Sequence, residues 1–147
     1  MEILAQEYFK IVDVISIYDG HLMAIKGWSI TVGMALIGYS FQQKQKMILL
    51  LCCTSSICFA LVDAKFKQYQ TSYYPRMREI EICINTEKAS CPVLQIDRSW
   101  VSSKSQNGYI QQFGKVNVLM PHFILFLLSI FLFFKPKIIE QDFQLKH

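Results

Sequence analysis

The chain has 147 residues, of which 52% are hydrophobic and 18% charged, and its mean hydropathy is +0.27. An ordinary soluble domain is less apolar, so the composition argues against one. The formal net charge of +4 comes mainly from Lys and Arg that flank apolar runs, and it gives no argument for nucleic acid as a partner.

The apolar residues gather in three runs, 27–41, 47–64 and 116–134. A bilayer core needs about 20 helical residues, which the third run provides and the second nearly provides. The first run is shorter, so a helix that crosses the bilayer here must include residues on either side of the run. In a soluble protein of this size, three such helices would leave apolar surface in water. We therefore predict an all-α integral membrane protein, with the lipid bilayer as its first partner.

Residues 1–26 predict an amphipathic helix. Apolar side chains recur at spacings of three and four on one face, and polar side chains follow the other. The apolar set is Leu4, Tyr8, Ile11, Ile15, Tyr18 and Leu22, and the polar set is Glu2, Gln6, Lys10 and Asp13. We expect the apolar face to pack within the protein, with contact to the membrane surface as the alternative. Acidic residues interrupt this segment, so a cleaved signal peptide is not expected.

Three titratable groups, Asp19, His21 and Lys26, lie just before the first apolar run. Only Gly20 interrupts the helical pattern here, and one Gly costs a helix about 1 kcal/mol, so one continuous helix is expected. Trp28 marks the membrane interface, where amphipathic rings gather. The three groups are predicted to set the depth of the span, with the ammonium of Lys26 among the headgroups.

Residues 27–64 predict a transmembrane helical hairpin. The link FQQKQK contains neither Gly nor Pro, and so short a connection makes its two helices antiparallel neighbours. The start of the first helix and the end of the second then share one membrane face. Lys26 and Asp63 should therefore lie at similar depth and could pair, a contact worth less than about 1 kcal/mol at an interface.

Small residues in the first run predict a close helix contact. These residues are Gly27, Ser29, Gly33 and Gly38. Ser29 and Gly33 fit a spacing that lets helix backbones approach closely in a membrane. The contact lies either within one chain or between copies.

Residues 65–115 form a polar insert. Its start is expected to continue the second helix, with a break near Pro75 because proline removes a backbone donor. The stretch SSKSQNG predicts a loop, and YIQQFGKV predicts a strand or the approach to the third span. The insert is too small for an independent enzyme domain, and it suits a cap, a sensor or a docking surface.

Residues 116–134 predict the third transmembrane helix, and residues 135–147 form a tail. The density of Phe and Leu in this span suits a lipid-facing position, with Pro121 near its start and His122 at the interface. Segments 1–26 and 65–115 hold ten Lys and Arg, against five in the turn and the tail. By the positive-inside rule, the N-terminus and the insert are expected to be cytoplasmic.

The sequence lacks the motifs of common catalytic and nucleotide-binding sites. Cys83 and Cys91 are the only cysteines outside the second apolar run, and they fall short of a zinc site. They are expected to be free, because a disulfide would require an oxidising compartment. His21 and His122 are expected to be polar interface residues rather than haem ligands. We expect no enzyme activity, no cofactor and no metal.

Two stretches, YDGHLMAIKGW and FALVDAKFKQYQTSYYPRMREIE, flank the hairpin. Their order resembles that of small bacterial membrane effectors of the SLATT type over roughly residues 5–84. The third span departs from the two-span plan of that group. The resemblance implies a non-catalytic effector of phage defence, in the bacterial inner membrane, that disrupts membranes on a signal. No catalytic or nucleotide-binding residues carry over.

Two functions follow as hypotheses. In the first, the chain forms a homo-oligomer that permeabilises its membrane, in response to a protein or small-molecule trigger. In the second, it is a non-conducting anchor or accessory subunit that docks a soluble partner through residues 65–115.

Overall fold

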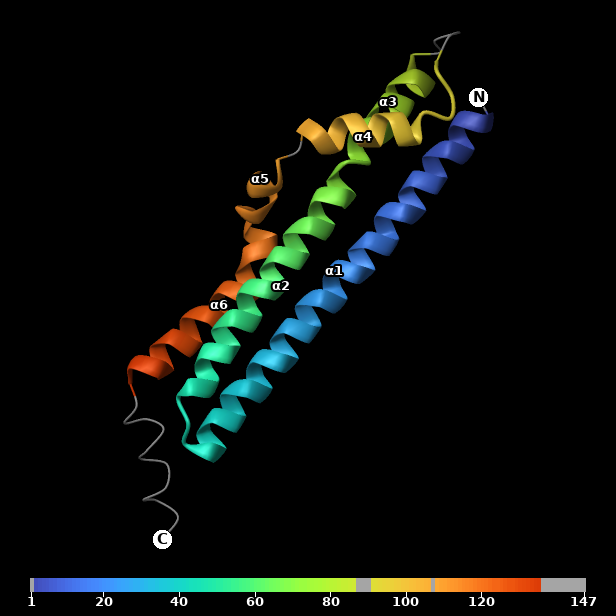
Figure 1. Cartoon of the computed structure of the whole chain (residues 1–147). Helices are drawn as coiled ribbons and strands as arrows, with labels where there is room; N and C mark the ends of the chain where they lie inside the picture. The colour runs from blue at the N-terminus through green and yellow to red at the C-terminus, as the bar shows by residue number, and fades with distance from the viewer. Residues whose placement is uncertain (1, 87–90, 107, 136–147) are drawn as a thin grey trace. The chain divides into compact units, whose positions relative to one another are not determined.

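The structure is a computed structural model that describes residues 2–86, 91–106 and 108–135, and these residues form helices and connecting turns without a strand (Figure 1). The helices are α1 (Glu2–Gln43), α2 (Met47–Thr71), α3 (Tyr74–Asn85), α4 (Ile96–Gln106), α5 (Tyr109–Phe113) and α6 (Val116–Phe134). Three helical stretches are long and apolar enough to cross a membrane, and they lie within Glu2–Gln43, Met47–Asn85 and Val116–Phe134. The all-helical class is confirmed.

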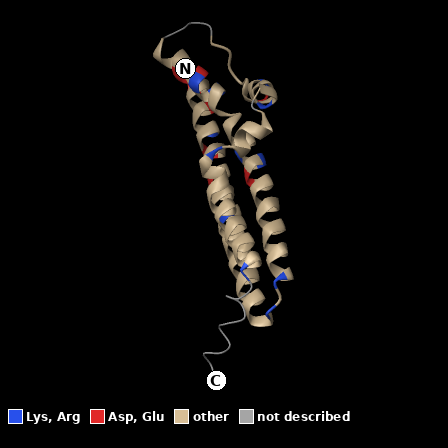
Figure 2. Ribbon diagram, turned by 90° about the vertical axis from the view of Figure 1, so that its left-hand side faces the viewer, with Lys and Arg blue, Asp and Glu red and all other residues tan. Residues whose placement is uncertain are grey.

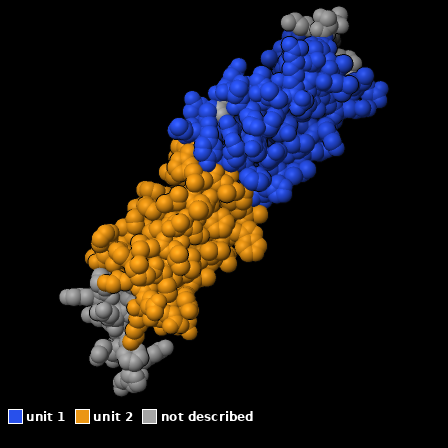
Figure 3. Space-filling view, in the orientation of Figure 1, with its two compact units in different colours: residues 1–23, 64–112 blue, residues 24–63, 113–147 orange. Residues whose placement is uncertain are grey.

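The chain divides into two compact units (Figure 3). Residues 1–23 and 64–112 form one, here called the polar unit, and residues 24–63 and 113–147 form the other, here called the apolar unit. Charged side chains are sparse along the helices of the apolar unit, and lysines lie at its α1–α2 turn (Figure 2).

The apolar unit contains the predicted hairpin. Helix α1 ends at Gln43, and Lys44 adopts a left-handed φ of 53°. The amide of Gln45 then donates to the carbonyl of Ser40 at 3.2 Å, the bond that closes a helix end before a reversal. Helices α1 and α2 consequently run side by side in opposite directions (Figure 1).

Helix α6 completes the apolar unit by burying one stripe against the hairpin. The stripe recurs at spacings of three and four and consists of Val118, His122, Leu125, Ser129 and Leu132. Ile37, Leu49 and Cys52 from the hairpin join Leu125 and Leu132 in one core. The rest of α6 is largely exposed, including Leu127 at 48%, and contact of this side with lipid stays a prediction.

The polar unit packs the start of α1 and the end of α2 with α3, α4 and α5. Leu4 and Ile11 of α1 form its core with Ile80 of α3. The expected packing of this amphipathic face within the protein is therefore confirmed. The break near Pro75 is also confirmed, because α2 ends at Thr71 and α3 begins at Tyr74.

One expectation for the insert is wrong, because most of the predicted SSKSQNG loop lies in α4, which runs to Gln106. Of the two alternatives for YIQQFGKV, the strand is excluded, because YIQQF forms the short helix α5 that leads into α6. In α4, the hydroxyls of Ser102 and Ser105 bond to carbonyls three residues back in the helix. Local hydroxyl bonds of this kind let serines remain in a helix that packing stabilises.

Candidate functional site

A buried polar network lies inside the apolar unit, and its members are Lys26, Ser29, Asp63 and His122. Asp63 of α2 is fully buried. Its Oδ2 lies 3.3 Å from Nζ of Lys26 on α1 and 3.3 Å from Nε2 of His122 on α6. One carboxylate oxygen therefore links all three helices of the unit.

Ser29 extends the network on the other side of the histidine ring. Its Oγ lies 2.8 Å from Nδ1 of His122, and both residues are buried. A histidine ring nitrogen can donate to a carboxylate, and a hydroxyl can donate to a ring nitrogen or accept from it. Both ring nitrogens of His122 therefore have a polar partner.

Ionisable groups inside membrane helices are costly and usually mark function. Oδ1 of Asp63 is buried and has no hydrogen-bond partner among the described residues. The side chain of Lys26 keeps 22% exposure, whereas that of Asp63 keeps none. Removing one partner of a buried ion pair leaves the other charge buried and unpaired, which is costly. The packing of the three helices therefore depends on the charges of Lys26, Asp63 and His122.

Ser29, His122 and Asp63 are the residue types of a hydrolase triad, but the geometry does not favour catalysis. Ser29 is only 2% exposed, and it lies on a regular helix turned towards α6. A nucleophile needs a reacting carbon within reach and donors for the developing oxyanion. The chain of bonds is better suited to holding helices together.

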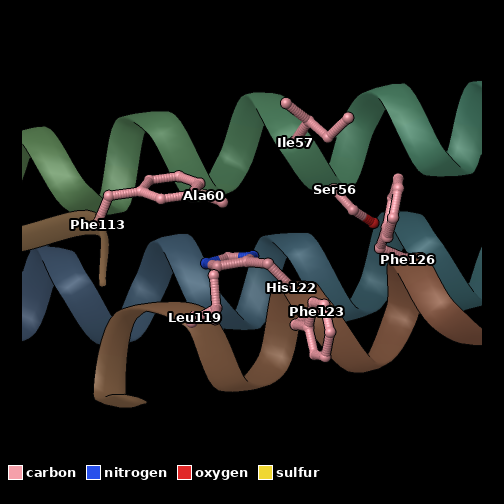
Figure 4. Close-up of a pocket in the computed structure, with 8 residues that line it drawn as sticks. All are labelled: Ser56, Ile57, Ala60, Phe113, Leu119, His122, Phe123 and Phe126. Atoms are coloured by element: carbon pink, nitrogen blue, oxygen red, sulfur yellow. The ribbon is translucent and has the colours of Figure 1, made fainter. Parts of the chain in front are cut away.

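An apolar cavity of about 240 Å³ adjoins the network (Figure 4). Residues of α2 and α6, with Phe113, form its wall, and His122 is the member of the network that reaches it. Ser56 also lies on the wall, and its buried Oγ has no partner in the part of the chain that the structure describes. The predominantly apolar lining suits an acyl chain or a similar group.

The predicted proximity of Lys26 and Asp63 is confirmed by their ion pair. The other two charges before the span lie elsewhere, in the polar unit. Asp19 Oδ1 accepts a hydrogen bond from Nε2 of Gln70 at 2.6 Å, and the His21 ring lies edge-on to Phe66. His122 is buried among the helices and has a polar partner at each ring nitrogen, and its expected depth at the membrane interface stays a prediction.

The four predicted packing residues separate into two sets. Ser29 and Gly33 face α6, and a Cβ added to Gly33 would lie 2.9 Å from Cδ1 of Leu125. For Ser29 and Gly33 the contact therefore lies within one chain. Gly27 and Gly38 have nothing within 4 Å of an added Cβ.

The polar unit holds a second buried ion pair that sequence reasoning missed. The guanidinium of Arg76 on α3 donates twice to Glu7 on α1, at 2.9 and 3.0 Å, and donates to the carbonyl of Pro92 at 2.7 Å. The amides of Leu94 and Gln95 also donate to Glu7. Burial opposes ionisation of Glu7, but Arg76 and these amides outweigh it and hold its pKa below the usual value.

Cys83 and Cys91 form a disulfide, so the expectation that they are free is wrong. The bond ties the end of α3 to the segment that Glu7 and Arg76 hold. A stable disulfide is typical of an oxidising compartment, whereas the count of Lys and Arg favoured the cytoplasm for this unit.

Comparison with protein-family models, with curated proteins and with solved structures finds no match for this chain. The resemblance to SLATT-type effectors over residues 5–84 remains a prediction.

Proposed function

We propose that this chain is a non-enzymatic membrane protein that self-associates through α1 and permeabilises the membrane that holds it. The observation that carries the proposal is an open face of small side chains on α1, opposite the face that packs on α2 and α6. The residues of this open face, at spacings of three and four, are Ala24, Gly27, Thr31, Ala35 and Gly38.

All five positions are exposed, whereas Ser29, Gly33 and Ile37 on the opposite side are buried. The Thr31 hydroxyl donates to the carbonyl of Gly27 at 2.9 Å, so its hydrogen bond is made within its own helix. Large exposed side chains, Trp28 and Met34, border the open face. The face therefore consists of small side chains between two large ones.

Such a face favours helix association in lipid. Apolar burial gives little advantage when the surrounding solvent is itself apolar, so membrane helices associate by close backbone packing. A second copy of α1 fits this requirement, because it presents the same small side chains bordered by the same large ones. Three helices alone enclose no water channel, so permeabilisation needs several copies.

The buried polar network supplies polar groups within this assembly. Lys26, Asp63 and His122 are satisfied against one another inside a single chain. A rearrangement of α6 against the hairpin would separate these groups from one another inside each chain. Polar residues lining an interior between helices are the usual markers of ion pathways.

Placement in a bacterial inner membrane and a role in phage defence are part of the proposal. Their support is the resemblance given above, and the trigger would be a protein partner or a small molecule. The absence of known catalytic motifs fits an effector without enzymatic activity.

One observation favours the second function, docking of a soluble partner through residues 65–115. The segment from Cys91 to Gln95 is held by the disulfide, by Arg76 and by Glu7. Within it, Val93 and Leu94 are 42% and 74% exposed, and Leu94 has a left-handed φ of 55°. A rigid segment that presents two apolar side chains suits a protein contact.

The test combines particle size with membrane potential. Wild-type chain in native-lipid nanodiscs should contain several copies, and its induced expression should depolarise cells. Gly27→Leu with Ala35→Leu should yield single copies and no depolarisation, with insertion into the membrane unchanged. Thr54→Leu is the matched control, because Thr54 is an exposed small residue on α2.

Thr54→Leu should behave as wild type. A wild-type chain that stays monomeric in native membranes, with no change of potential, would overturn the proposal and favour the docking function. Association of the double variant at the wild-type level would show that α1 is the wrong surface.

A further inference from the structure

Two lysines and three aromatic rings of the polar unit gather into a cluster that the function proposed above does not use. The cluster consists of Lys65 and Tyr69 on α2, Trp100 and Lys104 on α4, and Tyr109 on α5. Nζ of Lys65 lies 5.2 Å from the ring centroid of Tyr69 and 5.4 Å from that of Tyr109. Nζ of Lys104 lies 4.9 Å from the Tyr69 centroid and 4.6 Å from that of Trp100.

The aromatic frame of the cluster is held in place. The indole N–H of Trp100 donates to the carbonyl of Tyr69 at 3.3 Å, and the two rings pack with centroids 5.8 Å apart. Nε2 of Gln68 lies 3.5 Å from the carbonyl of Lys104, which links the same two helices. Side chains distant in sequence are thus fixed around the Tyr69 ring.

The two ammonium groups converge without a carboxylate. Among the residues that the structure describes, the ion pairs involve Lys26, Arg76 and His122, and neither lysine of the cluster takes part. Lys65 donates to the neutral oxygen of Gln68 at 3.0 Å. Each ammonium has three donors, so both retain capacity for an anion. Two positive charges near one ring repel each other unless an anion joins them.

The position along the chain points to the membrane surface. Lys65 follows Ala64, the last residue of the second apolar run, on the same continuous helix. Tyr109 stands a few residues before Val116, where α6 begins. Trp and Tyr concentrate at the depth of lipid headgroups, and lysines next to spans attract anionic lipids.

We propose that this cluster binds the phosphate of an anionic phospholipid headgroup, such as phosphatidylglycerol. Lys65 and Lys104 contact the phosphate oxygens, and the rings of Tyr69, Trp100 and Tyr109 pack against the glycerol region. A choline headgroup suits the cluster poorly, because its quaternary ammonium would compete with the two lysines for the same ring faces.

Trp100 provides a direct probe of lipid in the full-length chain. The chain has two Trp, so Trp28→Phe leaves Trp100 as the only one. This variant is placed in detergent micelles with brominated phosphatidylglycerol or brominated phosphatidylcholine, which quench a tryptophan that they contact. Brominated phosphatidylglycerol should quench Trp100 at a several-fold lower mole fraction than brominated phosphatidylcholine. The preference should shrink as salt is raised, because screening weakens surface charge attraction.

Lys65→Gln with Lys104→Gln should abolish the preference. Lys10→Gln with Lys46→Gln removes the same net charge at two exposed lysines elsewhere and should leave the preference intact. Equal quenching by both lipids, or an unchanged preference in the Lys65 and Lys104 variant, would overturn the proposal. Loss of the quenching by brominated phosphatidylglycerol when millimolar soluble glycerol phosphate is added would also overturn it. The site would then bind the free anion rather than the lipid.

Discussion

Glu7 shows how one buried side chain can organise a whole segment. Its carboxylate binds Arg76 of α3 and the amides of Leu94 and Gln95, so one residue of α1 holds α3 and the segment after the disulfide. Sequence reasoning assigned no role to Glu7. Its partners lie more than 60 positions away, and helical periodicity carries no information on contacts over that distance.

Glu7→Gln should destabilise the polar unit by about 3 kcal/mol, because it leaves the buried Arg76 without its main counter-charge. Thermal unfolding followed by Trp100 fluorescence in the Trp28→Phe background would measure the change. Glu2→Gln, at an exposed position on the same helix, should change stability little. Equal stability of the two variants would contradict the assigned role.

The same pair predicts an acid dependence of stability. The pKa of Glu7 is lower in the folded chain than the usual 4.5, so its contribution is fully present above that value. It is lost as pH falls from there through the folded pKa. Stability of wild type should therefore fall more steeply than that of Glu7→Gln below about pH 4.5. Parallel acid profiles would show that Glu7 contributes no such linkage.

Asp63 has the corresponding role in the apolar unit. Asp63→Asn removes the negative charge that faces both Lys26 and His122, and it should destabilise the unit by about 3 kcal/mol. Unfolding in mixed micelles would measure this cost. Adding Lys26→Met should recover part of the loss, because the unpaired cation is then gone. No recovery in the double variant would show that the Lys26 pair carries little of the energy.

At the scale of helices, the sequence predicted the larger elements and missed the small ones. The continuous α1, the hairpin and the break before Pro75 followed from long apolar runs, a short turn and one proline. Helix α4 was missed because serines favour turns in isolation, and only its packing against α2 and α3 overrides that tendency. The buried partners of His122 were missed, although a titratable residue within an apolar run is a signal for such a partner.

Gly33 determines how closely α6 approaches α1. Gly33→Leu should destabilise the apolar unit by about 1–3 kcal/mol, because even a Cβ would lie 2.9 Å from Leu125. Leu125→Ala added to this variant should restore part of the stability. Thr54→Leu, at an exposed position of α2 in the same unit, is the control and should leave unfolding unchanged. A loss at Thr54 as large as at Gly33 would contradict this packing.

At the scale of the whole molecule, two features of the chain favour opposite orientations in the membrane. The count of ten Lys and Arg against five includes the long insert, and long segments cross membranes largely regardless of charge. The Cys83–Cys91 disulfide favours an oxidising side for residues 65–115. In intact cells, an impermeant maleimide should label these two cysteines only after an impermeant reductant is added. Labelling that requires permeabilised cells would place the insert in the cytoplasm.

Self-association through the open face of α1 is the central claim, and cross-linking in native membranes tests it most directly. A single cysteine is placed at Ala35, or at Thr54 as the control, in a chain with Cys52, Cys53 and Cys58 replaced by Ala and the disulfide kept. Mild oxidation should give abundant dimers from Ala35→Cys and few from Thr54→Cys, because only the first lies on the proposed contact. Dimers from Thr54→Cys alone, or none from either position, would contradict the claim.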